Sequence, residues 1–179
     1  MRREAGFTLI ELMVTAGITV VITGLLVANF SRTRVDLNRA TISVTDGIRE
    51  AQSLALTGAA VRGMSRCGYG VHFTASGFIV YAGPESSAVD CATQDRNYDP
   101  TDTIIRSASL ANAGLEIVLP ADDIFFEPPD PTTYLNGTSS PTGSAVIYVR
   151  RLNAGCSGLR SVPDCRVIVV SGTGRIQTQ

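Results

Sequence analysis

One carboxylate, Glu11, interrupts an apolar run that extends from Phe7 to Phe30. As a helix, a run of that length covers about 36 Å, which is enough to span a bilayer. A carboxylate within such a segment costs about 2.5–3.5 kcal/mol in insertion experiments, so residues of this kind are usually kept for a partner or a function. The position of Glu11 therefore predicts a role beyond simple anchoring.

Two simpler interpretations of the apolar run are a secretory signal peptide and a plain membrane anchor. A signal peptide should end in a cleavage site of the small-x-small type, and the far end of the run, Leu25–Ser31, offers no convincing site. A plain anchor fits the length of the run and the leading arginines, Arg2 and Arg3, but it does not account for Glu11.

The four cysteines, which all follow the apolar run, predict disulfide chemistry. They lie in the part of the chain that should face the oxidising side of a membrane, and four cysteines permit three pairings. Sequence proximity favours Cys67–Cys91 and Cys156–Cys165, each worth about 3 kcal/mol in the chain-entropy model. A metal site is the alternative, but no C-x-x-C spacing occurs and the chain has 1 histidine.

Other residues that could do chemistry form no recognisable catalytic pattern. His72 alternates with expected core positions in a strand and has no identified base partner or nucleophile, and no common catalytic or phosphate-binding motif is present. Asn136-Gly137-Thr138 fits a glycosylation acceptor, although Asn-Gly is also a strong turn signal and the turn is the better interpretation.

No cofactor is expected. Four aspartates could hold calcium, but their spacing matches no EF-hand and a solvated acidic loop is favoured: Asp90, Asp95, Asp99 and Asp102.

Composition favours one globular head behind the apolar segment. The chain has 179 residues, 44% of them hydrophobic, and a net charge of −1, which gives no global attraction to nucleic acid. The charge is distributed unevenly, because acids dominate from Glu85 to Asp130 and arginines dominate beyond it. The later charges, opposed by Asp164, are Arg150, Arg151, Arg160, Arg166 and Arg175.

The helical pattern continues beyond Phe30. No proline occurs from Phe7 to Thr57, so a single helix of about fifty residues and about 75 Å is predicted. Gly58 is its expected stop, and Gly17, Gly24 and Gly47 are its expected weak points. One apolar stripe at three- and four-residue spacing comprises Leu37, Thr41, Val44, Ile48, Ala51 and Ala55.

The remainder of the chain shows strand and turn signals. Tyr69–Thr74 and Phe78–Tyr81 flank a short turn and predict a hairpin, and Arg166–Ser171 and Arg175–Gln177 predict another. Further strands are predicted at Thr103–Ser107, Leu115–Leu119, Ile124–Glu127 and Ala145–Arg150. Two long irregular stretches are predicted at Gly83–Asp102 and Pro128–Gly143, and loops of this length are uncommon unless they are functional or cross-linked.

The string Gly6-Phe7-Thr8-Leu9-Ile10-Glu11-Leu12 resembles the start of the type IV pilin superfamily, which includes type II secretion and DNA-uptake pseudopilins. The resemblance implies that a prepilin peptidase cuts between Gly6 and Phe7 on the cytoplasmic side and methylates the new amine of Phe7. It also implies that Glu11 pairs with the amine of a neighbouring subunit, which sets the axial stagger in the filament.

The later part of the chain resembles the GspH/FimT group of minor pseudopilins. Residues 48–55 and the ending Val169–Ile176 carry that resemblance, which implies a helix packed on a β-sandwich and a final Gly-Arg hairpin. Some members of the group bind DNA through arginines near this end. Here only Arg175 matches, because Gln177 and Gln179 stand where further basic residues would be expected. An exposed edge-strand charge that discourages aggregation is the alternative role for Arg175.

The sequence thus predicts an α+β protein with a long N-terminal helix and an antiparallel, β-sandwich-like, pilin-like head. We expect a leader at 1–6, a membrane or filament-core half of the helix at 7–30, an amphipathic half at 31–58 and the head at 59–179. The expected role is a non-enzymatic subunit of a type IV pilus or secretion pseudopilus. Its expected partners are other pilins, prepilin peptidase and the inner membrane, with the leader arginines in the cytoplasm. DNA uptake through the basic C-terminal region is the alternative function, and a tethered enzyme or ligand-binding domain is a third.

Overall fold

The structure, a computed structural model, describes residues 8–118, 122–128, 132–139, 141–156 and 158–179, without the side chains of residues 27–34. The chain divides into two compact units, one that ends at Asp36 and one that runs from Leu37 to Gln179. We call the second unit the head. The predicted domain boundaries at residues 6, 30 and 58 stay predictions.

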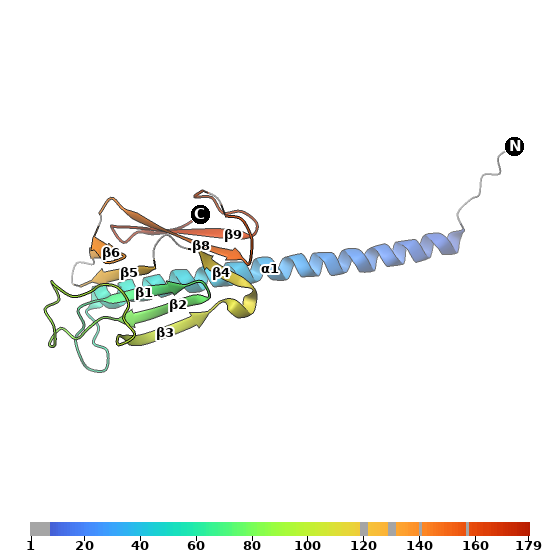
Figure 1. Cartoon of the computed structure of the whole chain (residues 1–179). Coiled ribbons are helices and arrows are strands. Elements are labelled where there is room, and N and C mark those ends of the chain that lie inside the picture. The colour runs from blue at the N-terminus through green and yellow to red at the C-terminus, as the bar shows by residue number, and fades with distance from the viewer. Residues whose placement is uncertain (1–7, 119–121, 129–131, 140, 157) are drawn as a thin grey trace. The chain divides into compact units, whose positions relative to one another are not determined.

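One long helix, α1, runs from Leu9 to Thr57 and contains 49 residues (Figure 1). It ends where Gly58 adopts a positive φ of 56°. The N–H of Ala59 donates to the carbonyl of Leu54 at 3.1 Å, and the N–H of Gly58 donates to that of Ala55 at 3.1 Å. These two bonds form a Schellman cap, which satisfies the last carbonyls of the helix. The predicted single helix and its stop at Gly58 are therefore confirmed.

The part of α1 that belongs to the head buries one face. The predicted apolar stripe is confirmed, because each of its members has 7% or less of its surface exposed. The two threonines at the edges of this face, Thr41 and Thr45, donate their hydroxyls to the carbonyls four residues earlier, both at 2.8 Å. The buried hydroxyls are thus satisfied within the helix.

The head contains two antiparallel sheets. The first has 6 strands in the order β3-β2-β1-β5-β6-β7. Its strands are β1 (Tyr69–Thr74), β2 (Gly77–Ala82), β3 (Thr103–Ser109), β5 (Asp123–Glu127), β6 (Thr132–Leu135) and β7 (Thr138–Ser139). The second has 4 strands in the order β10-β9-β8-β4. Its strands are β4 (Leu115–Val118), β8 (Ser144–Arg151), β9 (Cys165–Ser171) and β10 (Ile176–Thr178).

Both sheets and the helix contribute to one apolar core. Ile48 of α1, Phe126 of β5 and Ile168 of β9 each have no exposed surface and belong to the same cluster of buried side chains. Burying side chains of this size stabilises a fold by about 1.5–3 kcal/mol each. The predicted α+β class, with a long helix and an antiparallel β-rich head, is confirmed.

The prediction of an irregular stretch from Pro128 to Gly143 is wrong. It contains strands β6 and β7, which pair with each other on either side of Asn136-Gly137. These two residues have φ angles of 49° and 72°, as the turn of a tight hairpin requires. The turn interpretation of Asn-Gly is therefore confirmed. The other predicted strands are present with ends shifted by one or two residues, and Leu119, predicted to end a strand, lies outside the described residues.

Gly47 is a point of close packing in the head. A Cβ atom at this position would lie 2.5 Å from Cε2 of Phe78 and 3.2 Å from Nη2 of Arg106. Phe78 has 1% of its surface exposed, so the ring has little room to move. Glycine has a low helix propensity. It is nevertheless suited to this position, because any side chain here would clash with Phe78 of strand β2.

Candidate functional site

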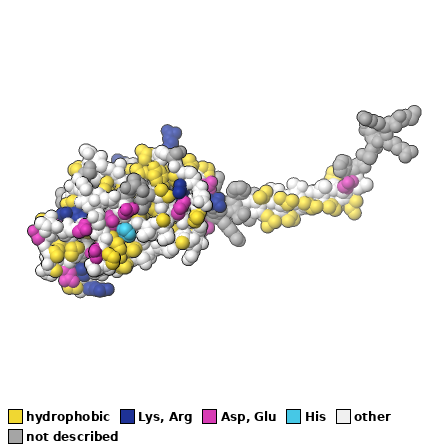
Figure 2. All heavy atoms as spheres, viewed as in Figure 1, with side chains coloured by type: hydrophobic (Ala, Val, Ile, Leu, Met, Phe, Trp, Pro, Cys, Tyr) yellow, Lys and Arg dark blue, Asp and Glu magenta, His cyan; other side chains and the backbone are white. Residues whose placement is uncertain are grey.

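The first segment of α1 exposes its apolar side chains in the structure. Residues Leu9–Leu26 form one helix long and apolar enough to cross a membrane, and none of this window is buried within the chain. Leu9 has 76%, Ile10 71% and Leu25 68% of its surface exposed. Figure 2 shows apolar side chains along this segment of the helix. Such a surface requires lipid or neighbouring helices to cover it.

Glu11 lies in the first turn of this helix and takes part in its N-terminal cap. The N–H of Glu11 donates to the hydroxyl oxygen of Thr8 at 3.4 Å, and the Thr8 hydroxyl donates to Oε2 of Glu11 at 3.5 Å. The carbonyl of Thr8 also accepts the N–H of Leu12 at 3.2 Å. Thr-x-x-Glu is the capping-box sequence pattern, and the bond from the N–H of Glu11 to the Thr8 hydroxyl is the N-cap half of that motif. A carboxylate here also interacts favourably with the positive end of the helix dipole. The carboxylate therefore has a local structural role in addition to the predicted one.

A ladder of threonines follows Glu11 along the helix. Thr15 donates its hydroxyl to the carbonyl of Glu11 at 2.9 Å, and Thr19 and Thr23 donate to the carbonyls four residues earlier, both at 2.7 Å. In a bilayer these hydroxyls would need no water, because the helix itself satisfies them. Residues four apart lie on one side of a helix, so the capping glutamate and the ladder share a face.

The predicted processing residues, Gly6 and Phe7, lie outside the described residues. Phe7 precedes Glu11 by four positions, which corresponds to about one helical turn, or about 6 Å of rise. Cleavage, methylation and the pairing of the Phe7 amine with Glu11 all stay predictions.

Two disulfides link the head. Cys67 is bonded to Cys91 with a Cα–Cα distance of 5.2 Å, and Cys156 is bonded to Cys165 with a Cα–Cα distance of 5.9 Å. These are the two pairs that sequence proximity favours. The first links the segment just before β1 to the long loop between β2 and β3, and the second links the loop after β8 to the first residue of β9.

The aspartates of the loop between β2 and β3 stabilise the loop itself. In the described residues, no group of three or more histidine, cysteine or acidic side chains is placed to hold a metal ion. Each of three aspartates accepts the N–H two residues further on: Asp90 from Ala92 at 3.0 Å, Asp95 from Asn97 at 3.0 Å and Asp99 from Thr101 at 2.8 Å. Such contacts are Asx turns, which explains the aspartates without a ligand.

His72, for which no partner can be identified from sequence, contacts Asp123 in the structure. Its Nδ1 lies 3.1 Å from Oδ1 of Asp123, and its ring stacks on Tyr98 at a centroid distance of 4.8 Å. The N–H of Tyr98 donates to the same Asp123 oxygen at 3.2 Å. Burial raises the pKa of Asp123, and the interactions with His72 and Tyr98 act in the opposite direction. The cluster attaches the acidic loop to strands β1 and β5.

Strand pairing neutralises part of the positive charge near the C-terminus. Arg150 Nε lies 2.9 Å from a carboxylate oxygen of Glu116, and Arg151 Nη1 lies 3.5 Å from one of Asp164. Arg175 is exposed just before β10, and no carboxylate lies within 4.0 Å of it among the described residues. Arg175 is thus an accessible charge at the turn between β9 and β10.

The structure thus combines a long helix that has an exposed apolar first segment, a carboxylate at the start of that helix, and a two-sheet head. Residues 1–27 match the family model described as the prokaryotic N-terminal methylation motif, which indicates a type IV pilin-like protein. The motif indicates processing by prepilin peptidase and assembly with other pilins, and it favours a structural protein over an enzyme. It ends before the head, so the GspH/FimT subgroup stays a prediction. No curated protein and no solved structure matches the chain significantly.

Sequence reasoning missed the capping role of Glu11 and the pairing of His72. The first had a signal, because Thr8-Leu9-Ile10-Glu11 is the capping-box pattern. The second had none, because His72 and Asp123 are 51 positions apart and meet only when β1 pairs with β5.

Proposed function

We propose that the protein is a non-enzymatic minor pilin or pseudopilin of the GspH/FimT type, anchored in the inner membrane before it enters a filament. After cleavage at Gly6, the amine of Phe7 would neutralise Glu11 of an adjoining subunit. The observation that carries this proposal is the exposed carboxylate of Glu11 at the capped start of a predominantly apolar helical segment, Leu9–Leu26, none of which is buried within the chain.

Glu11 places a negative charge among apolar side chains. A carboxylate packed among apolar helices without a cation is strongly unfavourable, and a nearby cation restores the balance. Inside one helix the hydroxyl of Thr8 contacts Glu11 at 3.5 Å, but a hydroxyl carries no charge. A neighbouring amine would supply the missing positive charge and would also fix the position of each subunit along the filament.

Co-expression with a prepilin peptidase tests the proposal. We expect the mass of the purified chain to fall by the residues Met1–Gly6, and the new N-terminal residue to be a methylated Phe7. A catalytically inactive peptidase is the control. A chain that keeps its full mass beside the active peptidase would instead favour a head that is merely tethered to the membrane.

DNA uptake is the second candidate function, and the exposed guanidinium of Arg175 is the observation that favours it. Contacts to phosphate would make the affinity fall steeply with salt. The test is titration of the full chain in detergent with duplex DNA at two salt concentrations, with Arg175→Ala as the variant and Arg151→Ala as the control. Equal binding by the wild type and Arg175→Ala would remove Arg175 from the proposal.

A further inference from the structure

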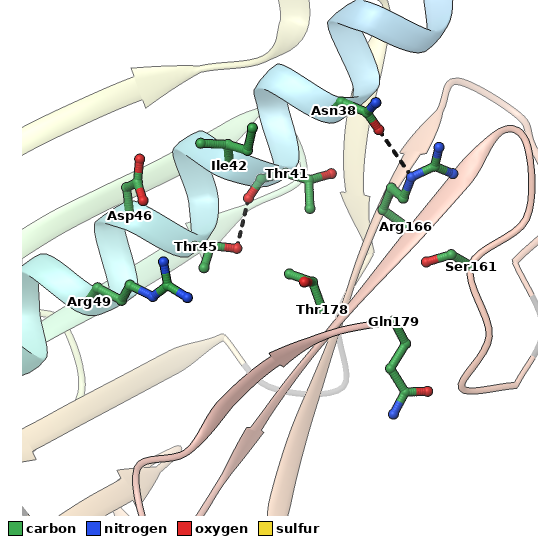
Figure 3. A pocket seen from close by; sticks show the side chains of 10 residues that line it. All are labelled: Asn38, Thr41, Ile42, Thr45, Asp46, Arg49, Ser161, Arg166, Thr178 and Gln179. Carbon is green, nitrogen blue, oxygen red and sulfur yellow. Dashed lines mark hydrogen bonds between the residues drawn. The ribbon is translucent and has the colours of Figure 1, made fainter.

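A groove of about 480 Å³ lies in the head between the helix and the end of the second sheet (Figure 3). One wall is the helical stretch from Asn38 to Arg49, and the other is formed by residues of β9 and β10 and by Ser161. The helical wall is about 16 Å long, which matches about five residues of extended chain.

Two hydrogen bonds join the helix to the second sheet and its last turn. Beyond the Arg49 end of the helical wall, Gln52 Nε2 donates to the carbonyl of Gly174 at 3.0 Å, although neither residue lines the groove. At the other end, Arg166 Nε donates to Oδ1 of Asn38 at 3.2 Å. Strand β10 begins at Ile176, two residues after Gly174, and ends at Thr178, beyond which Gln179 lines the groove. β10 therefore runs along the helix in the opposite direction.

The free edge of β10 faces away from its partner strand. The N–H of Ser171 donates to the carbonyl of Arg175, and the N–H of Gln179 donates to that of Val167, both at 2.9 Å. Antiparallel ladders alternate bonded and non-bonded pairs, so the N–H and C=O groups of Ile176 and Thr178 point outward. β10 is the last strand of its sheet, and among the described residues no backbone or side-chain group bonds to these outward groups.

The side chains of the groove add an apolar contact and positive charge. Ile42 lines the helical wall with 60% of its surface exposed. Arg49 has no ion pair among the described residues, and Arg166 donates Nη1 to the carbonyls of Val162 and Cys165 at 2.7 and 3.1 Å, which leaves its charge without a carboxylate. Among the lining residues that the structure describes, Asp46 has the only acidic side chain.

We propose that this groove binds an extended, acidic peptide segment of a partner protein, which pairs with the edge of β10 as an added strand. Ile176 and Thr178 would supply alternating donors and acceptors, which is the pattern that an extended chain recognises. Ile42 would contact an apolar side chain of the segment, and Arg49 and Arg166 would pair with carboxylates near its two ends. A nucleic acid fits less well, because its phosphates only accept hydrogen bonds and would leave the outward carbonyls unpaired. The proposal is independent of the pairing between Glu11 and Phe7.

The first experiment selects peptides from a phage-displayed library of random dodecapeptides on the full chain in detergent micelles. We expect enrichment of peptides that combine acidic residues with alternating apolar positions. A synthetic peptide of the enriched sequence should slow hydrogen exchange at the amides of Ile176 and Thr178. Enrichment of no peptide, or bound peptides that leave both amides unprotected, would overturn the proposal.

Thr178→Pro is the decisive variant. Proline removes the outward N–H of position 178 but no bond to β9, and edge strands tolerate proline at such positions. Because the donor is lost and the ring blocks the edge, the affinity for the selected peptide should fall by at least about tenfold. Thr178→Val keeps the N–H and should bind as the wild type does, and circular dichroism should show that both variants are folded. Equal affinity of Thr178→Pro and the wild type would contradict strand addition.

The charge of the groove is tested with a matched pair on one helix. Arg49→Gln should weaken the selected peptide and reduce its salt dependence, whereas Arg39→Gln should not, because Arg39 is exposed but does not line the groove. Competition by duplex DNA for the same site would assign the groove to nucleic acid, and dimerisation of the chain that Thr178→Pro abolishes would assign it to a second copy. Either result would overturn the proposed occupant.

Discussion

The two compact units differ in the exposure of the apolar side chains on helix α1, which contributes to both units. In the first unit, Leu9 and Ile10 are more than two-thirds exposed, whereas Val44 and Ile48 in the head have no exposed surface. The backbone hydrogen bonding of a helix is the same in each. Helix formation alone therefore does not decide whether the apolar side chains of α1 are buried or exposed. The head supplies its own core and cross-links, and the first unit depends on lipid or neighbouring subunits.

Removal of the carboxylate from the first unit should have the largest effect, and only on assembly. We expect Glu11→Val to insert in the membrane and to keep the stability of the head, but to be lost from filaments. Breaking one side of a buried ion pair costs about 3–5 kcal/mol. Immunoblots of membrane and sheared-filament fractions measure the two outcomes separately.

Thr15→Val is the matched control for Glu11→Val. It removes a polar atom one turn later, and the Thr15 hydroxyl bonds within its own helix. We expect Thr15→Val to assemble normally. Normal incorporation of Glu11→Val would contradict the role of the carboxylate.

Loss of a disulfide should affect only the head. Replacing Cys67 and Cys91 by serine opens a link over 24 positions, and replacing Cys156 and Cys165 opens one over 9. The chain-entropy model gives losses of about 3.5 and about 2.7 kcal/mol. Urea denaturation of the full chain in detergent, followed by circular dichroism, measures both, and membrane extraction should be unchanged. A larger loss for the shorter loop would disagree with this ranking.

Two glycines in the same helix provide a matched comparison of the two units. Gly47→Ala should destabilise the head, because the added methyl would lie 2.5 Å from Phe78. Overpacking of this kind costs about 1–3 kcal/mol. In Gly17→Ala the added methyl has nothing within 4 Å. No clash then opposes the higher helix propensity of alanine, so in detergent this variant should stabilise the helix by about 1 kcal/mol. Thermal unfolding of both variants tests the contrast, and equal midpoints would argue against close packing at Gly47.

The smallest effect concerns pH and again should be confined to the head. Burial raises the pKa of Asp123 and the pKa of Asp102 above their usual value of 3.8. A raised pKa means that the folded state binds the proton more tightly than the unfolded state does. The stabilisation of the folded state by these two protonated carboxyl groups is therefore fully present below pH 3.8. It is lost as the pH rises through the raised pKa values.

Replacing Asp123 by asparagine tests this pH dependence. Asparagine keeps an acceptor oxygen for the N–H of Tyr98 but does not titrate. We expect a flatter dependence of unfolding free energy on pH in Asp123→Asn than in the wild type, measured by urea denaturation at several pH values. Parallel curves for the two proteins would show that Asp123 is not responsible.

The sequence was sufficient to predict the parts of the fold that depend on local periodicity. The stripe from Leu37 to Ala55 repeats at the helical period, and Gly58 can adopt the positive φ that ends the helix. Strands β6 and β7 were missed because Thr132–Leu135 and Thr138–Ser139 show little apolar alternation. The Asn136-Gly137 turn between them can be predicted from sequence, but the two short strands that it joins cannot.

The candidate site divides in the same way. The position of Glu11 in an apolar run can be found from sequence, because the charged residue and its apolar neighbours are adjacent in the chain. The ion pairs that neutralise Arg150 and Arg151 could not be found, because their acids lie on β4 and in the loop before β9. The groove beside β10 likewise depends on how the helix and the sheet meet, which no local pattern encodes.

The cap at Thr8 has a consequence for maturation. The hydrogen bonds that the structure describes at the start of α1 join Thr8, Glu11 and Leu12, and all three residues lie beyond the predicted cut after Gly6. Severing the leader therefore takes away no partner of these bonds. Precursor and mature subunit can share one helix start, so proteolysis would convert the Phe7 nitrogen from a neutral amide into a cationic amine with no refolding step.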